Sequence, residues 1–424
     1  MKKIFSIIVL LFAICFYSNS QSKKILFIGN SYTYVNDLPN TIKSLALAGG
    51  DTVIVDSSTP GGYTFQLHTT NVTTLSQINA ASWDYVVLQE QSQLPSFEPT
   101  QVQAEVYPYA YILDSLIHKN NPCSQTVFYM TWGRKYGDAS NCAAYPPICT
   151  FEGMGMRLRQ SYLEMGDMYE CAVAPAGMAW KKSWSANPTI DLWSSDNSHP
   201  SVAGTYLTAC VFYSTIFKKP STGLSFISSL TPPTALYLQQ IADSTVFDSL
   251  TTWNIGVFDP KANYTWIDNG TEVQFANQSI NSTSYQWFFG DGTTDNTQNP
   301  NHVYLLPGIY PVKLIASDGC LTDTLIDTIN VFATGMCNDI LLSGISIYPN
   351  PVDDIVNVKF PDDLNGTYFI ELDKMDGQML QIKTIQAGST DNNISFDTKN
   401  LASGNYFIRI DSSTGVVLYK LIKK

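Results

Sequence analysis

The stretch ILFIGNSYT, residues 25–33, is an apolar run that stops at Gly29-Asn30-Ser31. Such a short apolar run bounded by turn residues is typical of a buried strand. Similar runs follow at residues 52–58 (TVIVDSS), 83–89 (WDYVVLQ), 125–132 (QTVFYMTW) and 170–177 (ECAVAPAG), and amphipathic helical patterns lie at about residues 40–48, 103–119 and 155–168. Because apolar strands that alternate with helices form parallel sheets, we predict a doubly wound α/β domain at residues 21–259.

The pattern changes after residue 259. Helical periodicity ends, and Thr, Asn, Ser and Gly interrupt short alternating strands, as in antiparallel β-sandwiches. We predict two such modules, at residues 260–333 and 345–424, with a linker at 334–344.

Residues 1–20 have the pattern of a secretory signal peptide, with a basic start, an apolar run and small residues at the end. The run is too short to span a bilayer, and no other stretch is long and apolar enough, so we expect no integral membrane segment in the mature chain. The net charge of −12 repels a phosphate backbone and argues against nucleic acid as a partner.

Seven of the eight cysteines follow the predicted signal peptide. Export favours disulfides, and an odd number leaves at least one thiol free. Cys142 and Cys149 flank a short Pro-Pro loop and are the best local pair, whereas Cys210 lies in a helical pattern that favours a buried thiol. No CxxC or HxxxH spacing accompanies the cysteines, so we predict neither a metal nor another cofactor.

Ser31 follows the first strand at the sheet edge where open parallel sheets bind ligands. A serine there can act as a nucleophile if a base reaches its hydroxyl and N–H donors reach the oxyanion. The alternative is a serine that caps a helix or turn.

The base of such a site is usually a histidine, and the chain has only four: His68, His118, His199 and His302. His302 falls in the first β module and His118 ends a helix, which leaves His68 and His199. His199 stands in DNSHPSVAG, three residues after Asp196, where a carboxylate in a tight turn can accept the imidazole Nδ1 proton. An Asp that caps a turn beside an unrelated surface His is the alternative.

The order IGNSYT, PGGYT, VVLQEQS and DNSHPSVAG resembles the sequence blocks of SGNH hydrolases, the GDSL-like esterases, over about residues 24–219. The resemblance implies a flavodoxin-like three-layer α/β/α fold. It also implies a triad of Ser31, His199 and Asp196, and an oxyanion hole to which the N–H groups of Ser31 and Gly62 contribute.

The third block departs from the family pattern. No Gly-x-Asn-Asp follows the strand YVVL; Gln89 and Gln91 stand there instead, similar to a Gln-Gly-Glu variant of some carbohydrate acetylesterase relatives. Because a glutamine amide also presents N–H donors, we assign the third oxyanion donor to Gln89. The alternative is a polar residue that merely ends the strand.

Further residues are predicted to line the substrate pocket: Gly61, His68, Gln91, Trp132 and Arg134. An aromatic ring and a guanidinium at this sheet edge suit stacking and hydrogen bonding to a sugar. A structural Trp132, and a His68 that packs on the sheet, are the alternatives.

The two β modules carry resemblances of their own. YQWFFGDG, residues 285–292, resembles the hallmark of a PKD domain, which we interpret as a spacer, with glycan or protein binding as the alternative. ISIYPNPVDDIVNV, residues 345–358, and GNYFIRI, residues 404–410, resemble the C-terminal sorting domain of the type IX secretion system, with a plain adhesive β-sandwich as the alternative. This resemblance implies passage through the periplasm, the type IX machinery as a partner, and a final place outside the cell or on its surface.

We therefore predict a secreted serine esterase that removes acyl groups, chiefly O-acetyl, from a glycan or another acylated small molecule. The alternative is a catalytically inactive glycan-binding or adhesive surface protein.

Overall fold

The computed structural model describes residues 22–332, 344–362, 364, 366–374, 378–387, 392–412 and 415–424. The predicted signal peptide and residues 334–343 of the predicted linker lie outside the described residues. The chain divides into two compact units, one ending at Asp259 and one beginning at Pro260.

A five-stranded parallel sheet forms the centre of the first unit. Its strands are β1 (Lys23–Ile28), β2 (Val53–Ser58), β3 (Tyr85–Leu88), β4 (Gln125–Tyr129) and β5 (Ala172–Ala174), in the order β2-β1-β3-β4-β5. This is the strand order of flavodoxin-like folds, so the predicted fold class is confirmed. The last four residues of β1 are fully buried, which explains why this strand reads as a continuous apolar run.

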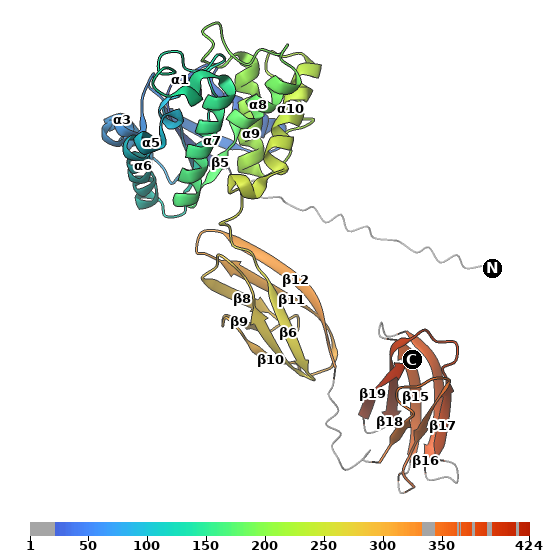
Figure 1. Ribbon diagram of the computed structural model, residues 1–424. Coiled ribbons are helices and arrows are strands. Elements are labelled where there is room, and N and C mark those ends of the chain that lie inside the picture. Colours follow the sequence, from blue (N-terminus) through green and yellow to red (C-terminus); the bar gives the residue numbers. More distant parts are fainter. Residues whose placement is uncertain are drawn as a thin grey trace, which may run out of the picture. The chain divides into compact units, whose positions relative to one another are not determined.

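Helices cover both faces of the sheet. The helices are α1 (Ser31–Tyr34), α2 (Leu38–Ala48), α3 (Phe65–Thr70), α4 (Val72–Ile78), α5 (Pro99–Glu105), α6 (Tyr107–Asn120), α7 (Phe151–Met168), α8 (Ala176–Ala186), α9 (Val202–Phe217) and α10 (Pro232–Phe247), with 3₁₀ turns at Leu94–Ser96, Pro146–Cys149 and Leu250–Trp253. Figure 1 shows α3, α5 and α6 on one side of this unit and α8, α9 and α10 on the other.

Helix α9 packs against one face of the sheet through buried aromatic side chains. The ring of Phe212 lies 5.9 Å from that of Phe27 in β1 and 5.0 Å from that of Tyr129 in β4, measured between ring centroids. Cys210, on the same helix, is a buried free thiol, as predicted. Because α9 follows His199 directly, its burial anchors the segment that carries this histidine.

The second unit contains two antiparallel β modules, each with its own hydrophobic core. The first has sheets β10-β7-β6 and β12-β11-β8-β9, formed by β6 (Tyr264–Asn269), β7 (Glu272–Asn277), β8 (Ser284–Phe288), β9 (Thr294–Asp295), β10 (Asn301–Val303), β11 (Gly308–Ser317) and β12 (Thr322–Val331). The second has sheets β13-β14-β17 and β16-β15-β18-β19, formed by β13 (Ser346–Tyr348), β14 (Ile355–Lys359), β15 (Gly366–Lys374), β16 (Met379–Ala387), β17 (Asn393–Asp397), β18 (Gly404–Ser412) and β19 (Gly415–Lys423). The prediction of two β-sandwich modules is confirmed.

Candidate active site

Ser31 is the first residue of α1 and follows β1 at its carboxyl end. Because β1 lies between β2 and β3, Ser31 stands where the strand order reverses, which is where open α/β sheets bind ligands. Asn30 caps α1: its side-chain oxygen accepts the Tyr32 N–H at 3.2 Å, and its amide donates to the Tyr63 carbonyl at 2.9 Å. The Gly-Asn-Ser sequence thus forms a capped turn that presents the serine at the sheet edge.

The structure brings Ser31, His199 and Asp196 together. The Oγ atom of Ser31 lies 2.8 Å from Nε2 of His199, and Nδ1 of that ring lies 2.5 Å from Oδ2 of Asp196. The other Asp196 oxygen accepts the N–H groups of Ser198 and His199, both at 3.0 Å. Partial burial opposes ionisation of Asp196, but the hydrogen bonds from His199 and from these two N–H groups lower its pKa below the usual value. An ionised Asp196 therefore holds the imidazole with Nε2 toward the serine.

A stack of aromatic rings supports the histidine loop. Tyr32 lies parallel to Trp132, with ring centroids 4.8 Å apart, and its hydroxyl lies 2.7 Å from Ser198 Oγ. The indole N–H of Trp132 donates to the Ser198 carbonyl at 3.1 Å. Since Trp180 stacks on its second face at 3.6 Å, Trp132 is fully buried. This corrects the expected contact of Trp132 with substrate, because neither face is left for a sugar.

His68 also lies inside the protein rather than along the pocket. Its ring is fully buried between the Thr74 hydroxyl, 2.8 Å from Nδ1, and the Gly29 carbonyl, 2.9 Å from Nε2. Burial lowers the pKa of His68 to about 4, so the ring is neutral at pH 7 and donates from Nε2 to Gly29. The prediction that His68 lines the pocket is therefore corrected: its ring supports the turn before Ser31 through the Gly29 carbonyl.

Gln89 is fully buried against the same turn. Its Oε1 accepts the Asn30 N–H and the Thr33 hydroxyl, both at 2.9 Å. Its Nε2 donates to Asn30 Oδ1 at 3.0 Å and to the Glu90 carbonyl. Both amide hydrogens are thus committed within the protein, which corrects the assignment of Gln89 as an oxyanion donor.

Sequence reasoning missed the neighbouring Glu90, a fully buried carboxyl group. One of its oxygens accepts the Phe65 N–H at 2.9 Å and the other accepts the Gln91 N–H at 2.5 Å. Burial raises the pKa of Glu90 to about 8, so the group is mainly protonated at pH 7. It ties the start of α3 to the loop after β3, and three consecutive polar residues after an apolar strand were the available signal.

The glycines of the loop after β2 lie beside α1. A Cβ on Gly61 would lie 3.6 Å from the Tyr34 hydroxyl, and Gly62 has φ +73°, a conformation that favours glycine. Both residues are exposed. Within the described part of the chain, the N–H groups of Gly61, Gly62 and Ser31 have no hydrogen-bond acceptor, so they remain available to a ligand.

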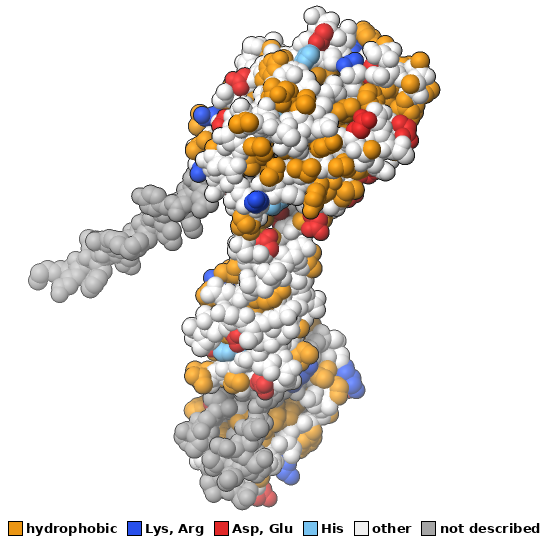
Figure 2. All heavy atoms as spheres, turned by 90° about the vertical axis from the view of Figure 1, so that its left-hand side faces the viewer, with side chains coloured by type: hydrophobic (Ala, Val, Ile, Leu, Met, Phe, Trp, Pro, Cys, Tyr) orange, Lys and Arg blue, Asp and Glu red, His pale blue; other side chains and the backbone are white. Residues whose placement is uncertain are grey.

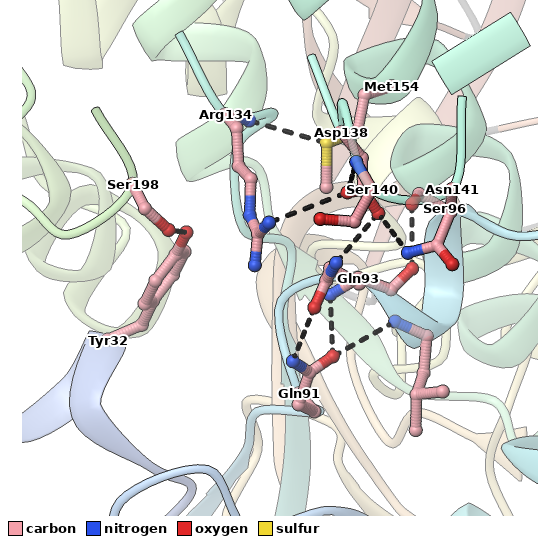
Figure 3. Close-up of polar contacts among 11 residues, drawn as sticks. Tyr32, Gln91, Gln93, Ser96, Arg134, Asp138, Ser140, Asn141, Met154 and Ser198 are labelled. Carbon is pink, nitrogen blue, oxygen red and sulfur yellow. Dashed lines mark hydrogen bonds and ion pairs between the residues drawn. The ribbon is translucent and has the colours of Figure 1, made fainter. Parts of the chain in front are cut away.

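Gln91 and Arg134 complete the residues predicted for the pocket. Oε1 of Gln91 accepts the N–H of Gln93 at 2.7 Å, and its Nε2 donates to Gln93 Oε1 at 3.1 Å. Arg134 follows β4, and its guanidinium is partly exposed on the side of Gln91, as Figure 3 shows. The loop after Arg134 is closed by the Cys142–Cys149 disulfide, which confirms that predicted pair.

Comparison with known proteins identifies the two β modules. Residues 259–332 match the PKD domain family, and residues 346–424 match the secretion system C-terminal sorting domain. The chain therefore carries a sorting module of the type IX secretion system, and its predicted secretion or attachment to the cell surface is confirmed. No helix in the described residues has the length and apolar character that a membrane span requires. No curated protein matches the chain.

Solved structures similar to the first unit include three bacterial proteins. A DUF4886 family protein from Bacteroides uniformis is 16% identical over 54% of this chain and 95% of that chain, with a TM-score of 0.47. A putative SGNH hydrolase from Slackia heliotrinireducens is 24% identical over 46% of this chain and 100% of that chain, with a TM-score of 0.38. A putative GDSL-like lipase from Parabacteroides merdae is 16% identical over 46% of this chain and 94% of that chain, with a TM-score of 0.35. These similarities concern the fold alone; the chemistry follows from the residues of this chain.

Proposed function

We propose that this chain is a serine hydrolase of carbohydrate O-acyl esters. Its first unit has the SGNH-hydrolase fold, and a PKD domain and a secretion-system sorting domain follow that unit in the sequence. One observation carries the proposal: Ser31 Oγ lies 2.8 Å from His199 Nε2, while Asp196 holds Nδ1 of the same ring. A hydroxyl within reach of an oriented imidazole is the arrangement that acyl transfer requires.

The residues support a two-step reaction. As Ser31 Oγ attacks the ester carbonyl carbon, His199 takes the hydroxyl proton and Asp196 stabilises the imidazolium that forms. Cleavage of the ester C–O bond releases the alcohol, which takes the proton from His199. Water then gives a proton to His199, attacks the acyl-enzyme and releases the acid, and Ser31 regains its proton.

The free N–H groups of Ser31 and Gly62 are the proposed oxyanion donors, with Gly61 beside them. Donors that are fixed before the reaction stabilise the developing charge without reorganisation. Gln89 contributes indirectly, because it fixes the backbone of Asn30 next to Ser31. Gln91 retains one amide hydrogen without an acceptor in the described part of the chain, and we assign that hydrogen to the substrate.

A carbohydrate ester suits the site better than a lipid ester. The side chains of His199 and Asp196 are 35% and 50% exposed, so the triad stands in an open site that admits a bulky alcohol. The polar side chains of Gln91 and Arg134 form a border beside the Tyr32–Ser198 pair, whose members neighbour Ser31 and His199 in the sequence. Hydroxyl-rich substrates match such a border, and secretion brings the enzyme to extracellular glycans.

The test is hydrolysis of acetylated oligosaccharides and of p-nitrophenyl acetate by the full-length chain, with Ser31→Ala as the matched variant. We expect release of acetate from the oligosaccharides by the wild type and a loss of at least about 10³-fold in the variant. Binding of the oligosaccharides without release of acetate would instead establish the inactive glycan-binding alternative.

A further inference from the structure

A partly exposed arginine side chain, Arg134, lies near the triad. Figure 3 shows the Arg134 guanidinium between the Tyr32–Ser198 pair on one side and Gln91 on the other. Tyr32 follows Ser31 and Ser198 precedes His199 in the sequence, so the guanidinium lies near the triad. The side chain of Arg134 is 28% exposed, which leaves part of the guanidinium accessible to a ligand.

The backbone on both sides of Arg134 is held in place. A Cβ on Gly133 would lie 2.7 Å from the Phe151 carbonyl, so glycine lets this loop approach α7 closely. The Arg134 N–H donates to Met154 Sδ at 3.3 Å, and the Lys135 N–H donates to the Asn197 carbonyl at 2.9 Å. The loop is therefore fixed both to α7 and to the turn that carries His199.

The buried carboxylate of Asp138 orients the Arg134 guanidinium but engages only one of its nitrogen atoms. Asp138 accepts hydrogen bonds from Gln93 Nε2 at 2.7 Å, Asn141 Nδ2 at 2.8 Å and the Ser140 N–H at 3.2 Å. Nη1 of Arg134 reaches it only at 3.5 Å. Burial of Asp138 opposes ionisation, but the hydrogen bonds from Asn141 and Gln93, together with the charge of Arg134, lower its pKa below the usual value. Asp138 thus orients Arg134 while leaving its other terminal N–H donors to a ligand.

Arg134 is a basic residue in an acidic chain. The chain has 24 Lys and Arg residues against 36 Asp and Glu residues, and Figure 2 shows basic side chains few and scattered on one face of the first unit. The other carboxyl groups nearby are committed, because Asp196 binds His199 and Glu90 is buried and mainly protonated. Within the described residues Asp138 is the carboxylate that pairs with Arg134, at 3.5 Å, so the exposed part of the guanidinium is open to a ligand.

We propose that Arg134, with the free amide hydrogen of Gln91, binds a carboxylate of the substrate, so that the enzyme prefers acylated acidic sugars such as uronic acids. This inference rests on the proposed esterase function. The planar terminal edge of a guanidinium matches the two oxygens of a carboxylate. Because Asp138 offsets part of the positive charge, a singly charged carboxylate suits the site better than a doubly charged phosphate.

The first test compares two substrates that differ only in charge: O-acetylated methyl glucuronide and its neutral methyl ester. We expect the wild-type chain to have the higher kcat/KM for the acid. The ratio of the two kcat/KM values should fall about 10- to 100-fold in Arg134→Gln, the range for loss of a hydrogen bond to a charged group. Arg159→Gln is the control for charge, because Arg159 lies on α7 over the ring of Trp253 and outside the site. Hydrolysis with no preference for the acid would overturn this inference and leave the esterase function intact.

The second test measures binding without catalysis. The full-length Ser31→Ala chain is titrated calorimetrically with methyl glucuronide, with its methyl ester and with glucose 6-phosphate. We expect the glucuronide to bind most tightly and Arg134→Gln, added to Ser31→Ala, to remove that advantage. Equal binding of acid and ester would refute the carboxylate site even if the wild type proved inactive, and tighter binding of the phosphate would replace it with a phosphate site.

Discussion

The side-chain oxygen of Gln89 accepts the backbone N–H of Asn30 at 2.9 Å, one residue before the proposed nucleophile. The two residues are 59 positions apart in the chain and meet because β1 and β3 are neighbours in the sheet. The same oxygen would lie 2.6 Å from a Cβ on Gly29, so glycine is needed there. The turn that presents Ser31 is thus shaped by a glutamine at the end of another strand.

The first prediction concerns Gln89→Ala. This variant leaves the Asn30 N–H and the Thr33 hydroxyl without their buried acceptor, so we expect the free energy of unfolding to fall by about 2 to 3 kcal/mol. The kcat should fall with it, because Ser31 loses its fixed position. Chemical denaturation and steady-state kinetics measure the two effects, with the exposed Gln66→Ala as the control. A loss of about 10² to 10³ in kcat at unchanged stability would restore Gln89 as a direct oxyanion donor.

A pH dependence of stability is predicted from Glu90. Its pKa is raised from 4.5 to about 8 in the folded chain, so between these values the folded state holds a proton that the unfolded state releases. Stability therefore decreases as pH rises through this window. Glu90→Gln has the same shape and no titratable group, so its free energy of unfolding should fall less than that of the wild type from pH 5 to pH 8. Parallel curves for the two proteins in urea denaturation would contradict the assignment.

The hydrogen bond between Tyr32 and Ser198 is predicted to position His199. Tyr32→Phe keeps the ring stack and removes the 2.7 Å contact with Ser198 Oγ, so we expect kcat to fall about fivefold, the equivalent of one hydrogen bond. Ser198→Ala should cost a similar amount, and the double variant should lose little more. Kinetics of the three variants form a double-mutant cycle. Fully additive losses would mean that the two side chains act independently.

The sorting module is predicted to direct export and to be dispensable for catalysis. A chain that ends at Phe332 retains the complete hydrophobic cores of the first unit and of the PKD domain, so we expect it to fold and to keep its esterase activity. In a host with type IX machinery it should accumulate in the periplasm, while the full chain reaches the medium or the surface. Cell fractionation compares them, and equal extracellular yield would refute the sorting role.

The sheet could be predicted from the sequence because its strands are buried on both faces and read as apolar runs. The juxtaposition of Asp196 and His199 could be predicted because it lies within one short turn. Helices α3 and α4 were not predicted, since each is only about two turns long and is held by caps and tertiary packing.

The errors at the site share one physical cause. Trp132 and Gln89 closely follow strands, and His68 lies on α3 after β2; pocket residues are expected at these positions, but all three side chains are fully buried. Burial depends on partners distant in sequence: the Trp180 ring for Trp132, the Gly29 carbonyl for His68 and the Asn30 backbone for Gln89. Local pattern places a side chain at the correct sheet edge, but it does not determine on which side of the turn the side chain lies.

The central claim, that Ser31 is a nucleophile activated by His199, is tested most directly by covalent labelling. The full-length chain is treated with a fluorophosphonate, and the modified residue is identified by peptide mass spectrometry. We expect a single adduct on Ser31 that is absent from Ser31→Ala and forms at least about 10²-fold more slowly in His199→Ala. An unlabelled Ser31 in the folded wild-type chain, or equal labelling rates in wild type and His199→Ala, would contradict the account.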